Sequence, residues 1–424
     1  MKVAYITAGA AGMYCGSCIN DNALAGALTK LGHDVVLLPT YTPTRTDVKN
    51  FSNQRVFLGG INAFLDQKSP RWRKAPGFMR WMLDRPMLLR AVSKFSDRTK
   101  AEDLGSLTES MLLGLEGPHS HDLNQLASWL QDHFRPDLVH ITNSMFLGVG
   151  VALKRSLNCR VVCSLQGEDL FLDDLIEPYK SRVFELLRTK AKGIDRLIAT
   201  ATFYADFMAE HVGFDRADID VVSLGVDSHA KVMRHDQPIL GFFARQSPEK
   251  GLDLLVDAFI EAKQHVQELT LRVGGYVAQK DRQYVDEQRQ KIAAMGLQSS
   301  TQFHGELDLA QKRSFLGELT MMALPTRYRE PKGLSVMESM ASGLPVILPR
   351  HGVFPELLQK GGGLLVEPLN HDALVTAIVE LARDPAIRAS MGAAAAASAA
   401  ESYSLEAMAR GMSAVYEDVM GGRE

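Results

Sequence analysis

The amino-acid sequence predicts an α/β protein built from two doubly wound domains, each a parallel sheet covered by helices on both faces. Short apolar runs alternate with helical patterns along the whole chain, as expected for parallel strands joined by crossover helices. The alternation pauses in the polar stretch 227–238 and then restarts. A chain of 424 residues is also too long for one ordinary core, so two domains of about 200 residues each are expected.

The two domains are expected over residues 1–225 and 226–402, and the C-terminal helix, about 403–420, is a candidate to pack back on the first. The strands expected in the first domain are 2–8, 35–38, 138–141, 160–165, 196–199 and 219–223. Those expected in the second are 239–243, 271–274, 301–304, 321–324 and 345–348. The alanine-rich run 391–400 predicts a helix, because alanine is the best helix former.

Composition argues against a nucleic-acid-binding protein and against a protein that spans the membrane. The chain is 46% hydrophobic and 23% charged, and its net charge of −3 gives no field that would attract nucleic acid. The N-terminus enters a strand pattern directly, and no apolar run reaches the roughly 18 residues of a membrane span. We therefore expect a cytoplasmic protein, with peripheral membrane contact left open.

The chain has only four cysteines, which is too few for a disulfide framework. Cys15 and Cys18 form a Cys-Gly-Ser-Cys pair, for which a redox or metal-binding role is one interpretation. Against it, Cys159 and Cys163 lie at the edge of a predicted core strand and offer no obvious second pair of ligands. The role of the pair stays open.

The most informative loop follows the strand expected at 321–324. Pro331 and Gly333 suit the start of a helix, whose exposed N–H groups at Gly333 and Leu334 would meet an anion. Glu330 lies before this helix and Glu338 more than one turn inside it, and both carboxylates accept hydrogen bonds from hydroxyl groups. The loop therefore predicts a site for a phosphate joined to polyols. The alternative is that both carboxylates are ordinary charges of an exposed helix start.

A second loop with the same character follows the strand expected at 239–243. It carries Arg245 and Lys250 on either side of a turn that enters a helix at Leu252. Arginine offers a planar fork and lysine a mobile point charge, which together suit a leaving diphosphate. The alternative is a pair of solvated loop cations.

The order and spacing of these motifs resemble the retaining glycosyltransferases of the GT-B fold, specifically family 4, the glycosyl transferases group 1. In that family an Arg and a Lys on the first loop of the C-terminal domain clamp the donor diphosphate, which matches Arg245 and Lys250. A Glu-x7-Glu motif matches Glu330 and Glu338, and the small-x-Gly-x-Pro-Val tail matches residues 342–346. The resemblance covers essentially the whole chain and implies two Rossmann-like domains facing a central cleft.

The resemblance also implies an activity. It is the metal-independent transfer of a hexosyl-like group from a nucleotide-diphosphate sugar, with retention of anomeric configuration and no other cofactor. By analogy Glu330 contacts the donor sugar, Gly333 and Leu334 give amides to the phosphates, and Glu338 accepts from the ribose hydroxyls. The acceptor, a glycan, lipid or small molecule, is not specified by the motifs.

Two loops of the first domain are expected to complete the site. In the glycine-rich loop 9–17, Gly16 and Ser17 are the counterparts of a family element near the phosphates. After the strand at 160–165 the family usually shows His-Gly-x-Asp, where this chain has Gln166 in place of the His. Glutamine can hydrogen-bond a sugar but cannot carry a proton. A catalytically impaired nucleotide-sugar-binding protein is therefore the alternative function.

The segment 68–100 interrupts the strand and helix rhythm. It holds ten lysines and arginines against two aspartates, with Trp72 and Trp81 among its interleaved apolar residues. Such a mixture suits an anionic membrane surface. The alternative is a solvated insert that packs its aromatic residues on the domain.

Overall fold

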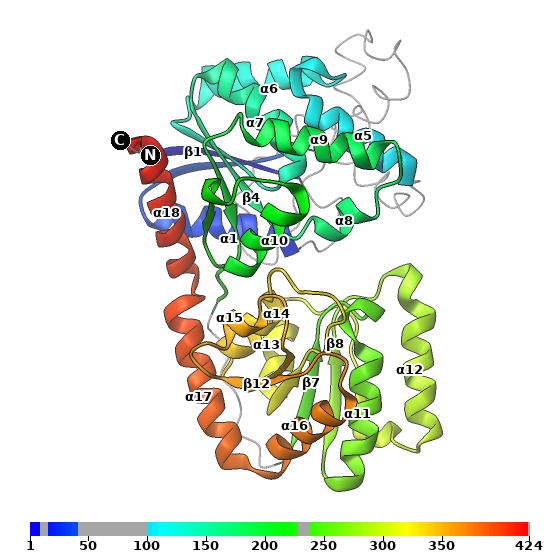
Figure 1. Cartoon of the computed structure of the whole chain (residues 1–424). Coiled ribbons are helices and arrows are strands. Elements are labelled where there is room, and N and C mark those ends of the chain that lie inside the picture. The colour runs from blue at the N-terminus through cyan, green and yellow to red at the C-terminus, as the bar shows by residue number, and fades with distance from the viewer. Residues whose placement is uncertain (9–15, 41–100, 228–236, 423–424) are drawn as a thin grey trace. The chain divides into compact units, whose positions relative to one another are not determined.

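A computed structural model describes residues 1–8, 16–40, 101–227 and 237–422. The chain divides into two compact units, one formed by Met1–Ser223 and Met408–Glu424 and the other by Leu224–Ala407. Each unit contains one six-stranded sheet with helices on both faces (Figure 1). The predicted α/β class with two doubly wound sheets is confirmed.

The first sheet has the strand order β2-β1-β3-β4-β5-β6, and every neighbouring pair is parallel. Its elements are β1 (Lys2–Thr7), α1 (Gly16–Lys30), β2 (Asp34–Pro39), α5 (Ala101–Leu113), α6 (Ser120–His133), β3 (Leu138–Ile141), α7 (Leu147–Leu157), β4 (Arg160–Leu165), α8 (Asp169–Asp173), α9 (Tyr179–Ala191), β5 (Arg196–Ala199), α10 (Thr202–Val212) and β6 (Ile219–Val221). The central strands β1, β3 and β4 are buried almost end to end, because helices cover both faces of a parallel sheet.

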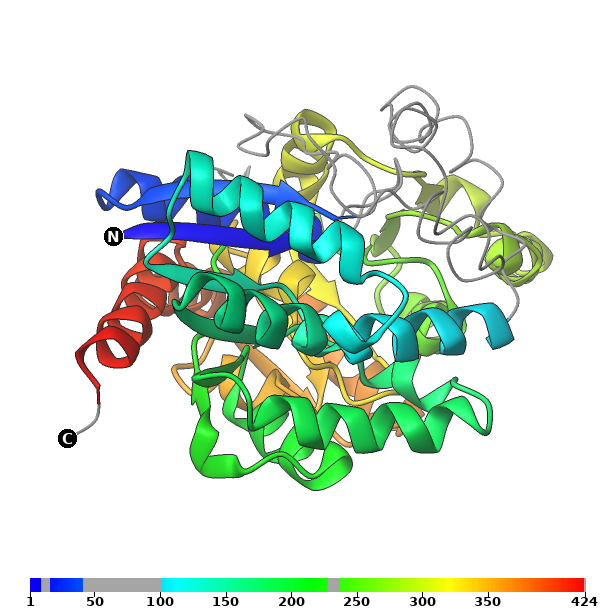
Figure 2. The ribbon, with the colours of Figure 1, turned by 90° about the horizontal axis from the view of Figure 1, so that it is seen from above.

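The C-terminal helix α18 (Leu405–Gly421) belongs to the first unit from Met408 onward. Its Tyr416 hydroxyl lies 2.6 Å from Nδ1 of His140 on β3, and Ser413 lies 2.9 Å from the ring of His33. Both views of the chain show α18 beside the start of β1 (Figures 1 and 2). The last helix of the chain thus packs on its first sheet.

The second sheet has the strand order β12-β11-β10-β7-β8-β9, again all parallel. Its elements are β7 (Ile239–Phe243), α11 (Leu252–His265), β8 (Thr270–Gly274), α12 (Arg282–Ala294), β9 (Thr301–Phe303), α13 (Leu309–Glu318), β10 (Met321–Ala323), α14 (Leu334–Ala341), β11 (Val346–Pro349), α15 (Phe354–Leu357), β12 (Gly363–Val366), α16 (His371–Arg383) and α17 (Pro385–Ser402). The chain proceeds from β7 to one side and from β10 to the other. The switch point of this sheet therefore lies between β7 and β10.

Two features differ from the sequence-based expectation. Helix α1 begins at Gly16, within the stretch 9–17 that was expected to be a loop, since the first N–H groups of a helix need no intrahelical partner and small residues are accepted there. Strand β12 was not expected, because it begins at Gly363 directly after Gly361 and Gly362 and so resembles a turn. A Cβ at Gly363 would collide with the carbonyl oxygen of Val346 on β11, which explains the glycine.

Some predictions fall on residues outside the described part of the chain, namely most of the glycine-rich loop 9–17, Cys15 and the basic segment 68–100. Cys18 itself is buried on α1. No helix among the described residues is long and apolar enough to cross a membrane. The cytoplasmic location stays a prediction.

Candidate active site

The residues expected to bind a donor diphosphate lie on two loops that leave neighbouring strands of the second sheet. The loop after β7 carries Lys250 and the loop after β10 carries Glu330, and the two strands pair directly. Gly251 has a φ of +74°, and a Cβ there would collide with the carbonyl oxygen of Pro325. Only glycine permits this backbone approach. The loops therefore meet at the switch point, where open α/β sheets bind their ligands.

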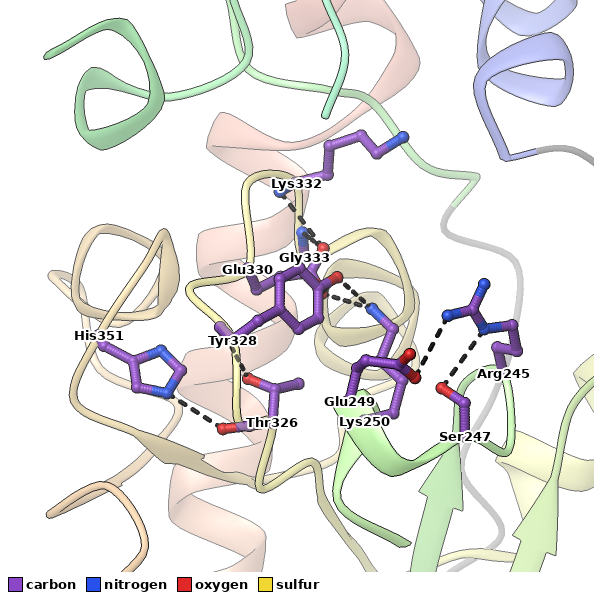
Figure 3. A network of polar contacts seen from close by, with 10 residues as sticks. All are labelled: Arg245, Ser247, Glu249, Lys250, Thr326, Tyr328, Glu330, Lys332, Gly333 and His351. Atoms are coloured by element: carbon purple, nitrogen blue, oxygen red, sulfur yellow. Dashed lines mark hydrogen bonds and ion pairs between the residues drawn. The ribbon is translucent and has the colours of Figure 1, made fainter. Parts of the chain in front are cut away.

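A buried carboxylate stands at the centre of this meeting point. Glu330 is 4% exposed, and its Oε2 accepts hydrogen bonds at 2.5 Å from both Lys250 Nζ and the Tyr328 hydroxyl. Lys250 Nζ also donates to the Tyr328 hydroxyl at 2.7 Å and lies 4.8 Å from the centre of its ring. The three side chains form a closed triangle of polar contacts (Figure 3).

This triangle sets the charge state of Glu330. Burial raises the pKa of the carboxyl group, but the charge of Lys250 and the hydrogen bonds from Lys250, Tyr328 and the Gly333 amide outweigh it. The net result lowers the pKa of Glu330 to about 2. Glu330 is therefore a carboxylate throughout the physiological pH range.

The N-terminus of α14 lies directly beside this carboxylate. Gly333 caps the helix in the left-handed conformation, with a φ of +68°. Its N–H, which we expected to be exposed, is buried and donates to Glu330 Oε1 at 3.3 Å. The first helical bonds run from Val336 and Met337 back to the Gly333 carbonyl, so the N–H groups of Leu334 and Ser335 stand ahead of the hydrogen-bond ladder. Those two amides, rather than that of Gly333, are placed to meet an anion.

Glu338 lies further along the same helix and has a cation of its own. Lys312 on α13 donates to Glu338 Oε1 at 2.6 Å, and each side chain is 18% exposed. On the apolar side of α14, Met337 and Met340 are buried, whereas Leu334 and Ala341 are only half-buried. The helix is short and loop-bound at both ends, which leaves its first and last residues partly uncovered.

Arg245 lies on the loop after β7 but outside the triangle. Its Nε is 3.3 Å from the Ser247 hydroxyl, and its NH2 is 3.4 Å from Oε2 of Glu249. The side chain is 42% exposed, and Figure 3 shows its guanidinium beside Glu249. The pKa of Glu249 is lowered because its hydrogen bonds, together with the charges of Arg245 and Lys280, outweigh the opposing effect of burial.

The predicted site residues of the first unit lie at the ends of β1 and β4. Gly16 and Ser17 are the first two residues of α1. Gln166, directly after β4, is 6% exposed, and its Nε2 donates to Asp21 Oδ1 at 2.8 Å and to the Thr142 hydroxyl at 3.3 Å. Its Oε1 is buried and has no hydrogen-bond partner in the described part of the chain. The Gln166 amide is thus committed to a buried network.

Asp21 on α1 is the acceptor at the centre of that network. Besides Gln166 it accepts hydrogen bonds from the hydroxyls of Tyr5 at 2.8 Å, Thr7 at 2.6 Å and Thr142 at 2.6 Å. Complete burial raises the pKa of Asp21 to about 6, although these four hydrogen bonds oppose the shift. One carboxylate therefore ties α1 to the ends of three neighbouring strands.

Sequence reasoning missed three residues of these networks: Tyr328, Lys312 and Asp21. Asp21 precedes Leu24, Ala25 and Leu28 at helical spacing, so its place on the buried face of α1 was readable from the periodicity. No comparable signal exists for Tyr328 and Lys312, whose contacts depend on how separate loops and helices meet. From the predicted set, Lys250 and Gly333 both contact Glu330. Arg245 lies on the loop that carries Lys250, and Leu334 and Glu338 lie on the helix that Gly333 caps. Gly16, Ser17 and Gln166 belong to the first unit.

Known proteins share this architecture. The crystal structure of Anabaena Alr3699/HepE in complex with UDP superposes with a TM-score of 0.69 at 16% identity, covering 98% of this chain and 100% of that one. At this identity the likeness shows the fold alone, and that fold is GT-B.

The sequence itself matches known families and relatives. Residues 227–398 match the family model described as Glycosyl transferases group 1, and residues 112–230 match Glycosyltransferase Family 4. The lipopolysaccharide core biosynthesis mannosyltransferase LpcC of Rhizobium leguminosarum bv. viciae is 29% identical over 235 residues, 54% of this chain and 66% of the relative. The GDP-mannose-dependent monoacylated alpha-(1-6)-phosphatidylinositol monomannoside mannosyltransferase of Corynebacterium glutamicum is 31% identical over 180 residues, 40% of this chain and 45% of the relative.

The two family matches overlap at residues 227–230 and together span residues 112–398. The matches confirm the resemblance recognised in the motifs, which is to the group 1 glycosyltransferases. The matched regions span between about half and two thirds of the length of the two curated relatives.

Proposed function

We propose that the chain transfers a glycosyl group from a nucleoside-diphosphate sugar to an acceptor, with retention of anomeric configuration. The observation that carries the proposal is the Lys250, Tyr328 and Glu330 triangle at the N-terminus of α14. It places a cation, a fixed carboxylate and helix-start amides within one small region. That combination suits a diphosphate bonded to a hydroxyl-rich sugar.

The leaving diphosphate develops negative charge as its bond to the sugar breaks. Lys250, Arg245 and the amides of Leu334 and Ser335 are the groups that would stabilise this charge, and being preorganised they need little rearrangement. Glu330 stays ionised because of its lowered pKa and therefore acts as a hydrogen-bond acceptor for sugar hydroxyls rather than as a proton donor. Since cations and amides supply the charge stabilisation, we expect turnover to be insensitive to EDTA.

The catalytically impaired alternative has its own supporting observation. Gln166 replaces the family histidine, and its amide is held by Asp21 and Thr142 in a buried network. A side chain so held can neither carry a proton nor turn freely toward a substrate. Under this alternative the chain binds nucleotide sugars without turning them over.

One experiment separates the two functions. The chain is incubated with UDP-, GDP- and ADP-sugars, and both nucleoside diphosphate release and ligand-induced thermal stabilisation are measured. Release above the uncatalysed rate supports the enzyme, and proton NMR of the product gives the anomeric configuration. Thermal stabilisation without release under every donor and acceptor supports the impaired protein, and neither response contradicts both.

The acceptor class is supported only by the relatives and by composition. The names of the two relatives describe mannosyltransferases of lipopolysaccharide core biosynthesis and of a phosphatidylinositol mannoside, and this chain carries the basic segment 68–100. We propose a lipid-linked acceptor and peripheral contact with an anionic membrane. Cosedimentation with phosphatidylglycerol vesicles at low salt is the expected result, and its absence would end this part of the proposal.

A further inference from the structure

A second ion pair joins the same two loops outside the contacts described above. Arg327, on the loop after β10, faces Asp253 in the first turn of α11. The guanidinium NH1 and NH2 lie 2.7 and 2.6 Å from Asp253 Oδ1 and Oδ2, which is a bidentate pair. The Tyr284 hydroxyl of α12 donates to Asp253 Oδ1 at 2.6 Å and accepts from the Asp253 N–H at 2.9 Å. Asp253 is thus held from two sides.

Arg327 also contacts the backbone of the segment that carries Lys250. Its NH1 donates to the Pro248 carbonyl at 2.8 Å, and its own N–H donates to the Glu249 carbonyl at 2.9 Å. These contacts lie immediately before Lys250, and the ion pair with Asp253 lies just after it. Arg327, through its side chain and its backbone N–H, therefore holds the loop on both sides of Lys250.

Each of the two loop segments carries one cation and one carboxylate three residues apart, and the cation comes first in both segments. Asp253 follows Lys250 by three residues, and Arg327 precedes Glu330 by three. If one loop slid along the other by this spacing, Lys250 would face Arg327 and like charges would oppose each other. Only one register satisfies both pairs.

We propose that Asp253, Arg327 and Tyr284 form a positioning clamp that holds Lys250 Nζ at Glu330 and so sets the geometry of the diphosphate site. The inference rests on the proposed function, because the clamp affects nucleotide binding only if Lys250 binds the diphosphate. Asp253 and Arg327 are 24% and 36% exposed, and ion pairs this open contribute little to stability. The lysine stem is flexible, so the place of its amino group depends on how its loop is held.

The chain offers a matched control for the clamp. Asp257 lies one turn after Asp253 on α11 and pairs with Lys291 of α12 at 2.6 Å. This pair joins the same two helices as Asp253 and Tyr284, but it contacts neither of the loops that carry Lys250 and Glu330. Asp257→Asn therefore removes an ion pair with a similar N–O distance, 2.6 Å, while leaving Asp253, Arg327 and Tyr284 in place.

The test measures dissociation constants for UDP and GDP by calorimetry in the wild type, Arg327→Gln, Asp257→Asn, Lys250→Met and the Arg327→Gln/Lys250→Met double variant. We expect Arg327→Gln to weaken binding of the nucleotide that binds by about tenfold, the middle of the range for coupled neighbouring groups, and Asp257→Asn by less than about twofold. In the Lys250→Met background Arg327→Gln should add less than about twofold, because the clamp acts through Lys250. Unchanged affinity in Arg327→Gln, or an equal loss in both backgrounds, would overturn the proposal.

Two further measurements distinguish a failure of the clamp from a failure of the proposed function. Hydrogen exchange of the ligand-free peptide 326–337 should be faster in Arg327→Gln than in Asp257→Asn, and equal rates would contradict the clamp. A wild type that binds neither UDP nor GDP is titrated with ADP, and no binding of any of the three contradicts the proposed function. The exchange measurement then decides the clamp alone. Should Arg327→Gln fail to fold, Tyr284→Phe removes both hydrogen bonds that the Tyr284 hydroxyl makes with Asp253 and should weaken binding by a few-fold.

Discussion

Replacing Lys250 with methionine leaves the Glu330 carboxylate buried without its cation. The methionine side chain keeps most of the stem of the lysine, so the change removes charge with little change in volume. The side chains of Lys250 and Glu330 alone are 18% and 6% exposed, so the pair is nearly buried. Removing one partner of such a pair strands the other charge, at a cost of about 3 to 5 kcal/mol.

The pKa of Glu330 gives an independent magnitude. A fall from 4.5 to about 2 corresponds to about 3 kcal/mol of unfolding free energy. In the wild type this contribution is present above pH 4.5 and is lost as the pH falls toward 2. In Lys250→Met the hydrogen bonds from Tyr328 and Gly333 still oppose the burial that raises the pKa, but the lysine no longer does, so the pKa of Glu330 rises from its wild-type value. The variant then lacks part of the stability that the ionised carboxylate contributes above pH 4.5, so its deficit relative to the wild type is larger at pH 7 than at pH 3.

The positions of the tryptophans decide the assay. The second unit, Leu224–Ala407, contains no tryptophan, so tryptophan emission does not report on its unfolding and serves as an internal control. Unfolding of the second unit is followed by hydrogen exchange of β7 and β10 amides in urea. Lys291→Met is the matched lysine variant, and its exposed pair should cost less than about 1 kcal/mol. A loss below about 1 kcal/mol in Lys250→Met, or an equal deficit at both pH values, would refute the reasoning.

Three further predictions follow from the structure. Gly251→Ala should destabilise the second unit by about 1 to 3 kcal/mol in urea unfolding, more than Gly296→Ala, since both have positive φ but only Gly251 lacks space for a Cβ. Asp21→Asn should abolish a loss of about 3 kcal/mol that the wild-type first unit undergoes as the pH rises from 3.8 to about 6, followed by tryptophan emission. Glu338→Gln should weaken UDP or GDP binding about tenfold in calorimetry while leaving pyrophosphate binding unchanged, because pyrophosphate has no ribose.

The strands were predictable from the sequence because parallel strands buried on both faces appear as continuous apolar runs. β3, β4, β5 and β7 begin and end at the residues expected. β12 was not predicted, because two glycines precede it and a third is its first residue. Apolar runs therefore predict a strand where its side chains are buried. They do not predict a strand that begins with glycine because a neighbouring backbone lies too close for a side chain.

The loops that hold the candidate site were predictable, but their contacts were not. Parallel strands place their carboxyl ends along one edge of the sheet, which is why Lys250 and Glu330 were expected near each other. The roles of Tyr328 and Arg327 depend on how one loop lies on the other, which no spacing within either loop encodes. Gln166 shows the same limit, since its partner Asp21 lies on a helix 145 residues earlier.

The turnover of Lys250→Met relative to the wild type tests the central claim most directly. Nucleoside diphosphate release is measured at saturating donor, with hydrogen exchange of the second unit confirming that the variant is folded under assay conditions. If Lys250 stabilises the leaving diphosphate, kcat should fall by about 10² to 10³, the range for loss of one preorganised charge-stabilising group. A folded variant with unchanged kcat would contradict the assignment of the Lys250 and Glu330 pair as the reacting site.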